Sequence, residues 1–213
     1  MLTYKVGNMN KCFLILSLLI SLTAGAQNTP QLRTGDVLLQ PLKCWACALI
    51  EAEEDSIYSH MGVVLAVTPE ILVAEAFGTV KKVTLREFLA KTERGQKTKL
   101  LRFRNDKLTA HFQTNSQSFL KMFNDEFEGA TYDSEFLWNN LDSAGNEKLY
   151  CSEMISKLFQ YFVGIEAPIK QMHFRKNREH WLAYFQGNIP DDRWGNSPAD
   201  FDRSELFYSA GEL

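Results

Sequence analysis

The chain has 213 residues, 45% of them hydrophobic, and a formal net charge of −3 at pH 7. This length suffices for one compact domain with its own core, and the acidic balance argues against nucleic acid as a general partner. No internal repeat, low-complexity tract or long Pro/Gly-rich linker divides the sequence.

Residues 1–26 have the layout of a cleaved secretory signal. Two lysines precede an apolar run over residues 12–22, and Ala24 and Ala26 match the small-residue cleavage pattern. The apolar run is too short for a stable membrane anchor. We therefore expect an exported protein, periplasmic or extracellular, whose single mature domain comprises residues 27–213.

The first half of the mature chain is rich in short apolar segments. The pattern predicts a buried strand over residues 35–40 and a helix over 46–54. Residues 61–67 and 71–77 are rich in Val, Ile and Leu, and the Thr-Pro-Glu turn between them predicts a β-hairpin.

Helix signals dominate the rest of the chain. A capping box at Thr84 and Glu87 opens a predicted helix over residues 85–90. The polar stretch from Asp191 to Asp202 is expected to wrap the domain as a tail. Between these segments the pattern predicts a strand over residues 99–104 and two amphipathic helices. The two helices cover residues 116–127 and 150–163. This order predicts an α+β fold with an antiparallel sheet packed against helices.

The mature chain keeps three cysteines, and an odd number in an oxidising compartment cannot all pair. At least one is therefore expected to be a free thiol. Cys44 and Cys47 form a C-x-x-C motif, but no second such motif or closely spaced His pair completes a zinc site. A structural disulfide, or a pair of buried small residues, is favoured over a redox role because the thioredoxin-type context is absent.

Cys151 stands at the predicted start of the second amphipathic helix. Unpaired backbone N–H groups and the helix dipole favour a thiolate there. The same N–H groups are placed to hold the oxyanion that forms when the sulfur attacks a carbonyl. On this residue alone, a buried half-apolar cysteine on a core helix is an equally good interpretation.

His60 and Glu75 lie on the two strands of the predicted hairpin. His60 directly precedes the first strand, a rigid place from which to present an imidazole, although a surface histidine there is commoner. Glu75 interrupts an apolar strand, where a buried carboxylate needs a partner and an exposed one would face water. In an antiparallel hairpin Glu75 returns beside the start of the first strand, so we expect it to orient His60.

Taken together, these segments resemble the YiiX-like branch of the permuted NlpC-type, papain-like cysteine peptidases. The motifs that carry the resemblance are Gly35-Asp36, Tyr58-Ser59-His60-Met61-Gly62-Val63-Val64, Glu75-Ala76-Phe77, Tyr150-Cys151-Ser152-Glu153-Met154-Ile155 and Ser197-Pro198-Ala199-Asp200-Phe201. The resemblance implies a papain-like fold in which the histidine strand precedes the cysteine helix. It also implies hydrolysis or transfer at an amide through a thioester.

On this resemblance Cys151 attacks, His60 moves the proton and Glu75 fixes the imidazole. Tyr150 is a substrate-binding or oxyanion candidate, although its ring could simply pack beside the nucleophile. Asp36 and Tyr132-Asp133 also match the branch, as structural or substrate-adjacent positions. The chemistry needs no metal or organic cofactor.

The expected function is that of a secreted cysteine hydrolase acting on an amide, in cell-wall-derived or other short peptides. A lipid-directed acyl hydrolase or acyltransferase is the first alternative, because a thioester intermediate serves ester and acyl substrates equally. A binding protein on an inactive hydrolase scaffold is the second. A thiol-disulfide protein using Cys44 and Cys47 is the third. The partner is thus a peptide or an acylated small molecule.

Overall fold

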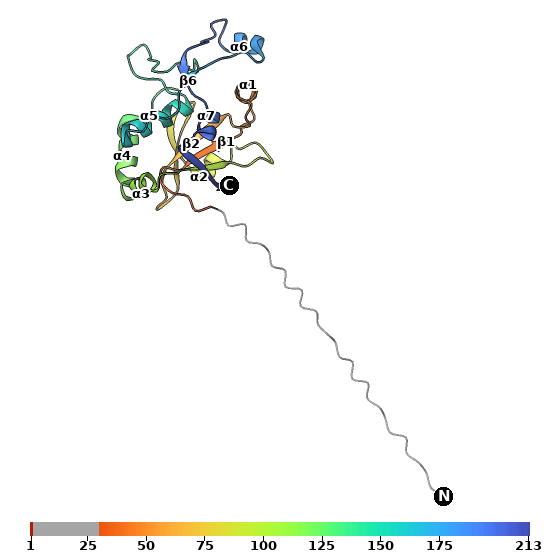
Figure 1. The fold of residues 1–213 in the computed structure, drawn as a ribbon, viewed down its shortest axis with the longest axis vertical. Coiled ribbons are helices and arrows are strands. Elements are labelled where there is room, and N and C mark those ends of the chain that lie inside the picture. The colour runs from red at the N-terminus through yellow and green to blue at the C-terminus, as the bar shows by residue number, and fades with distance from the viewer. Residues whose placement is uncertain (2–29) are drawn as a thin grey trace.

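The fold is built around one antiparallel sheet (Figure 1). The computed structural model describes Met1 and residues 30–213, so the predicted signal sequence lies outside the described residues apart from Met1. The sheet has the strand order β4-β3-β2-β1-β5-β8. Its strands are β1 (Val37–Gln40), β2 (His60–Ala66), β3 (Leu72–Phe77), β4 (Thr79–Thr84), β5 (Lys99–Phe103) and β8 (Phe207–Glu212).

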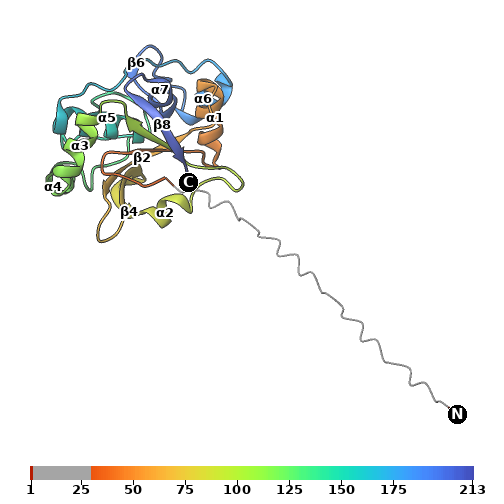
Figure 2. The same ribbon diagram turned by 60° about the horizontal axis from the view of Figure 1, so that its bottom comes forward.

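Helices cover both faces of this sheet. On one face α3 (Asp106–Thr114), α4 (Ser116–Glu126) and α5 (Cys151–Val163) enclose a core rich in phenylalanine. The short helix α2 (Leu85–Leu89) packs against β3 and β4 and covers a smaller core that includes Phe88 (Figure 2). Burial on both faces explains why β2 is apolar along nearly its whole length.

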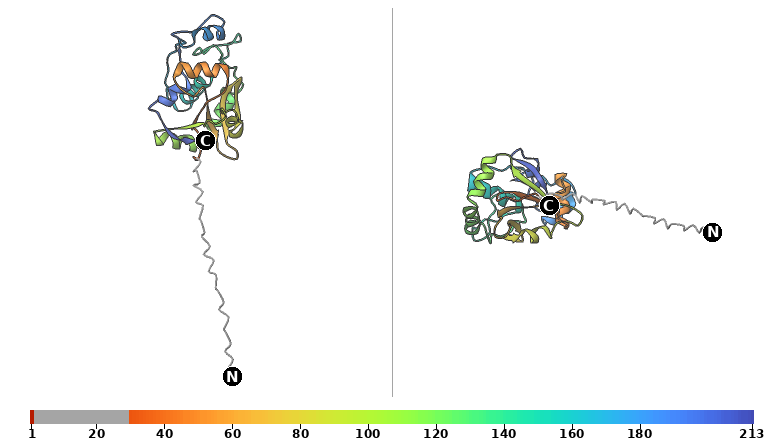
Figure 3. Two further views of the ribbon diagram at one scale, coloured as in Figure 1. Left: turned by 90° about the vertical axis from the view of Figure 1, so that its right-hand side faces the viewer. Right: turned by 90° about the horizontal axis from the view of Figure 1, so that it is seen from below.

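A second layer lies beyond one end of the sheet. There α1 (Trp45–Glu54) lies between the sheet and α6 (Arg178–Tyr184), as Figure 3 shows. The remaining elements are the two-stranded pair β6 (Lys170–Gln171) and β7 (Trp194–Gly195), and the helix α7 (Pro198–Arg203). A separate aromatic core that includes Phe136, Phe174 and Trp181 holds this layer together. We call this layer the aromatic lobe.

The predicted α+β class and antiparallel sheet are confirmed. The hairpin forms as β2 and β3, and the capping box at Thr84 and Glu87 opens α2 with both reciprocal hydrogen bonds. The predicted polar tail contains β7 and part of α7, and Asn196 between them binds Ser152 near the start of α5. Among the described residues, no helix is long and apolar enough to cross a bilayer.

Candidate active site

The hairpin register brings His60 and Glu75 together. Glu75 pairs with Gly62 across β2 and β3, and His60 stands two residues before Gly62, so its side chain lies on the same face of the sheet. His60 Nε2 lies 3.0 Å from Glu75 Oε2, and both side chains are buried. The predicted pairing is thus present in the structure.

Lys91 holds the other oxygen of Glu75. Its Nζ donates to Glu75 Oε1 at 2.9 Å. Burial acts to raise the pKa of Glu75, but hydrogen bonds and charge attraction from His60 and Lys91 outweigh it and hold that pKa below its usual range. Glu75 is therefore an ionised carboxylate at neutral pH, as a group that orients an imidazole must be. The sequence reading missed Lys91, because no local pattern connects it to Glu75.

Gly62 lets the helix α2 approach the histidine strand closely. A Cβ at Gly62 would lie 2.7 Å from both the Phe88 ring and a Val73 methyl carbon, which is closer than side chains pack. The Phe88 ring in turn stacks on His60 with 5.7 Å between ring centroids, and Phe77 contacts its edge at 5.5 Å. The imidazole is thus fixed by two aromatic rings as well as by Glu75.

Cys151 is the first residue of α5, which packs against β2 and β3. It is a free thiol with 6% of its surface exposed. Burial acts to lower the pKa of His60, yet the interactions of its ring with Cys151 and Glu75 raise it above its usual value. Since Nε2 faces Glu75, Nδ1 is the nitrogen left for the thiol. The three residues predicted for catalysis therefore lie together.

The helix start offers hydrogen-bond donors beside the sulfur. The residue that precedes α5, Tyr150, has extended backbone and provides no side-chain cap. The first N–H groups of a helix have no partner within that helix. Backbone donors are thus available next to Cys151, where an oxyanion would form.

A small pocket of about 40 Å³ opens between Cys151 and the aromatic lobe. Its lining residues are Ile50, Glu53, Glu54, Ser59, Tyr132, Phe136, Tyr150, Cys151, Ser152, Met172, His173, Phe174, Trp181, Asn196, Ser197 and Pro198. Burial raises the pKa of Tyr150 and of Tyr132 well above 10, with nearby acidic groups adding to it. Both phenols are therefore neutral hydrogen-bond donors in the pocket wall.

The C-terminal segment clamps the start of α5 through Asn196. The backbone oxygen of Asn196 accepts from Ser152 Oγ at 3.0 Å, and its Nδ2 donates to Ser156 Oγ at 2.7 Å. The backbone N–H of Asn196 donates to the Tyr150 hydroxyl at 3.2 Å. Tyr150 thus lines the site, and its hydroxyl also binds the C-terminal segment. An oxyanion role for this hydroxyl stays a prediction. The importance of Asn196 was not visible in the sequence.

Asp36 and Asp133, which match positions typical of the YiiX-like branch, form contacts within the protein. Asp36 accepts from Arg102 through both carboxylate oxygens, at 2.8 and 2.7 Å. Asp133 is fully buried and accepts from the backbone N–H groups of Glu135 and Leu137. These contacts assign both residues to holding loops and strands in place.

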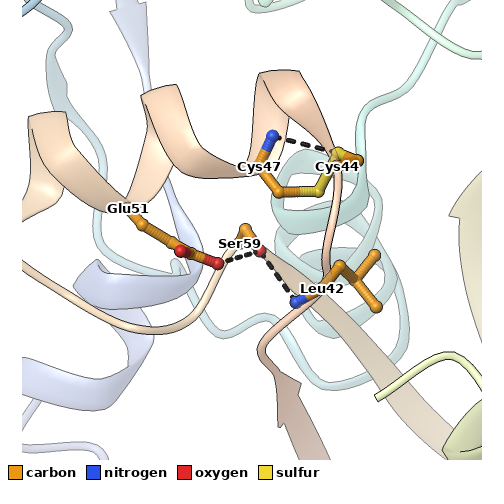
Figure 4. The surroundings of a disulfide bond; sticks show 5 residues. All are labelled: Leu42, Cys44, Cys47, Glu51 and Ser59. Carbon is orange, nitrogen blue, oxygen red and sulfur yellow. Dashed lines mark hydrogen bonds between the residues drawn. A yellow bond between two sulfur atoms is a disulfide. The ribbon is translucent and has the colours of Figure 1, made fainter. Parts of the chain in front are cut away.

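Cys44 and Cys47 form a disulfide at the start of α1 (Figure 4). Cys44 Sγ also accepts from the backbone N–H of Cys47 and so caps the helix. One turn further on, Glu51 accepts from Ser59 Oγ at 2.8 Å, and Ser59 directly precedes His60. The pair is thus part of the scaffold beside the site. Within the described part of the chain, no cluster of three or more His, Cys, Asp or Glu could hold a metal ion.

Comparisons with known proteins bear on the family and the fold. Residues 31–205 match the family model described as permuted papain-like amidase enzymes, YaeF/YiiX, C92 family. The uncharacterized protein YiiX of Escherichia coli (strain K12) is 28% identical over 163 residues, which cover 76% of this chain and 73% of that protein. A crystal structure titled metalloprotein yiiX, from Escherichia coli O157:H7, superimposes with a TM-score of 0.73 at 23% identity, covering 86% of this chain and 98% of that one.

Proposed function

We propose, given that this chain belongs to the permuted papain-like amidase family, that it is an exported cysteine hydrolase that cleaves an amide bond through a thioester. Cys151 is the nucleophile, His60 the acid and base, and Glu75 the group that orients His60. The observation that carries this proposal is the single buried constellation of these side chains at the start of α5.

The first half of the reaction forms the acyl-enzyme. His60 takes the thiol proton, and the Cys151 sulfur attacks the amide carbonyl carbon. The carbonyl oxygen becomes an oxyanion, which the N–H groups at the start of α5 are placed to stabilise. The C–N bond then breaks, His60 gives its proton to the leaving amine, and a thioester on Cys151 remains.

The second half releases the acid. His60 removes a proton from a water molecule, whose oxygen attacks the thioester carbonyl carbon. The C–S bond breaks and the sulfur leaves as a thiolate, which recovers its proton from His60. Glu75 stabilises the positively charged imidazole in both halves, because its carboxylate stays ionised at 3.0 Å from Nε2.

Short peptides, including those derived from the cell wall, are the proposed substrates. The predicted secretory signal over residues 1–26 supports action outside the cytoplasm. The small size of the pocket beside Cys151 supports a short group over a long acyl chain. This substrate class differs from that of a lipid-directed acyl hydrolase.

The test compares turnover of a panel of short peptide amides by the wild-type protein and by Cys151→Ala and His60→Ala variants. Each substitution should lower kcat by at least about 10²-fold, since nucleophile and base each contribute on that order. Cys44→Ala serves as the matched cysteine control and should retain turnover. Full activity in the Cys151→Ala variant would overturn the proposal.

A further inference from the structure

Two polar atoms on almost fully buried side chains in the wall of the Cys151 pocket have no hydrogen-bond partner among the described residues. They are the indole nitrogen Nε1 of Trp181, a donor, and the amide oxygen Oδ1 of Asn196, an acceptor. Both residues are almost fully buried, at 1% and 2% exposure. An unpaired buried donor or acceptor costs free energy, so such atoms point to a missing partner.

The orientation of the Asn196 amide is fixed by its nitrogen. Nδ2 donates to Ser156 Oγ at 2.7 Å and to the carbonyl oxygen of Pro168 at 3.1 Å. A carbonyl oxygen only accepts, so the nitrogen must face Pro168 and the oxygen must stay free. The unpaired acceptor is therefore a property of the site.

The charged groups of the pocket are already engaged. Glu54 pairs with Lys170 through both carboxylate oxygens, at 2.8 and 2.7 Å. Glu53 accepts from the backbone N–H of Lys176 at 2.8 Å. His173 is partly exposed, and its Nδ1 lies 3.1 Å from Asp192 Oδ1 but lacks hydrogen-bond geometry. A ligand in this pocket therefore meets no carboxylate that lacks a partner, and a neutral group fits best.

The pocket is also small and mostly apolar. A volume of about 40 Å³ has room for only a few water-sized groups, whereas a drug-sized ligand needs about 300 Å³ or more. Ile50, Phe136 and Met172 are among its walls, and the flexible thioether of Met172 can adapt as a ligand widens the pocket to reach the two polar atoms. A long fatty acyl chain would leave both polar atoms unpaired.

We propose that this pocket binds the acyl side of the substrate and recognises a secondary amide one residue away from the bond that is cleaved. The carbonyl oxygen of that amide accepts from Trp181 Nε1, and its N–H donates to Asn196 Oδ1. The substrate is thus a short, neutral peptide with a small residue beside the reacting carbonyl. This inference rests on the proposed function and adds two specificity residues to it.

The test follows the indole N–H resonance of Trp181 by NMR in the ¹⁵N-labelled Cys151→Ala protein, which cannot turn over. The chain has four tryptophans, and a Trp181→Phe variant identifies the resonance by its disappearance. Three probes of equal chain length are titrated: N-acetylglycinamide, 4-oxopentanamide, which lacks the inner N–H, and pentanamide, which lacks the whole inner amide. Circular dichroism checks that the Trp181→Phe protein is folded.

The Trp181 resonance should shift with N-acetylglycinamide and, at about 3- to 10-fold weaker affinity, with 4-oxopentanamide, since one neutral hydrogen bond is lost. Pentanamide should leave the Trp181 resonance in place. The Trp181→Phe variant, whose binding is followed through its remaining resonances, should bind N-acetylglycinamide about 3- to 10-fold more weakly. An unmoved resonance at high probe concentration, or equal shifts with all three probes, would overturn the subsite. The proposed function has a separate test. Turnover of amides that does not depend on Cys151 would overturn it, whatever the NMR titration shows.

Discussion

At the scale of single residues, the site depends on one buried carboxylate that is bound through both of its oxygens. Glu75 is fully buried and is bound by His60 on one oxygen and Lys91 on the other. Its position follows from the hairpin register, in which it faces Gly62, two residues after His60. Lys91 comes from the turn after α2, so a group outside the proposed triad keeps Glu75 charged.

Replacing Glu75 by Gln should lower kcat by about 10²-fold while the fold is retained, because the amide cannot stabilise a positively charged imidazole. The loss of a carboxylate that raises the pKa of His60 should also move the limb of the pH–rate profile governed by His60 to lower pH. The exposed Glu70→Gln on the same hairpin is the control. A Glu75→Gln variant with wild-type kcat and pH profile would contradict the orienting role.

A second buried carboxylate, Glu153, stands two residues after Cys151. Its Oε1 accepts from the backbone N–H of Asn139 at 2.8 Å and pairs with Lys157 at 2.8 Å, whereas its Oε2 has no partner among the described residues. Burial raises its pKa to about 7, against the attraction of Lys157, and the charge of Glu147 adds to that rise. Glu153 thus titrates near neutral pH inside the fold.

Glu153 should make the wild-type protein less stable as pH rises. A carboxyl whose folded pKa lies above its unfolded value stabilises the fold below about 4.5, and this contribution is lost as pH rises through about 7. Glu153→Gln should remove this dependence and be the more stable protein at pH 8, by on the order of 3 kcal/mol. Lys157 keeps Glu147 as a partner in the variant.

Urea unfolding between pH 4 and 8 measures this effect. The exposed Glu166→Gln on the loop after α5 serves as control and should follow the wild-type curve. Identical pH dependence in the wild-type and Glu153→Gln proteins would show that Glu153 keeps an ordinary pKa.

At the scale of elements, α1 connects the disulfide to β2, the strand that begins with His60. Cys44 and Cys47 close the first turn of α1, and Glu51 on the same helix binds Ser59, which precedes His60 (Figure 4). Further along, Ile50 and Glu54 line the pocket beside Cys151. The disulfide therefore lies at the start of a helix that forms one wall of the site, and we expect it to act on the stability of that wall.

The double variant Cys44→Ser, Cys47→Ala should lose about 2 kcal/mol of unfolding free energy, since the crosslink closes a very short loop. Serine at position 44 preserves the helix cap, so the loss reports the crosslink itself. Turnover per folded molecule should stay within about 2-fold of wild type. Thermal unfolding with and without a dithiol reductant measures the effect, and loss of turnover in a folded variant would restore the redox interpretation.

At the scale of the whole molecule, local signals predicted the frame and much of the site. Apolar runs and the Thr84 capping box placed the hairpin, α2 and α5, and through them His60, Glu75 and Cys151. The sequence did not predict α3 or the edge strands β4 and β8. In β4 the paired lysines Lys81 and Lys82 obscure the alternation, and in β8 small residues weaken the strand pattern.

The groups that the sequence could not place act across long distances in the chain. Asn196 binds Ser152 from 44 residues away, and Lys91 reaches Glu75 from 16 residues away. For Trp181 the sequence favoured core packing over a place in a substrate groove, because an unpaired indole N–H becomes visible only when its neighbours are known. Periodicity reports which face is buried, but not which polar atom is left without a partner.

The most direct test of the central claim is to trap the acyl-enzyme. Turnover of an N-acetylglycyl amide is quenched in acid, and intact mass and peptide mapping locate the bound acyl group. The account predicts one acetylglycyl group on Cys151 that neutral hydroxylamine removes as expected for a thioester, and none in the Cys151→Ala protein. Turnover that proceeds with no acyl group on Cys151, or with the group on another residue, would contradict it.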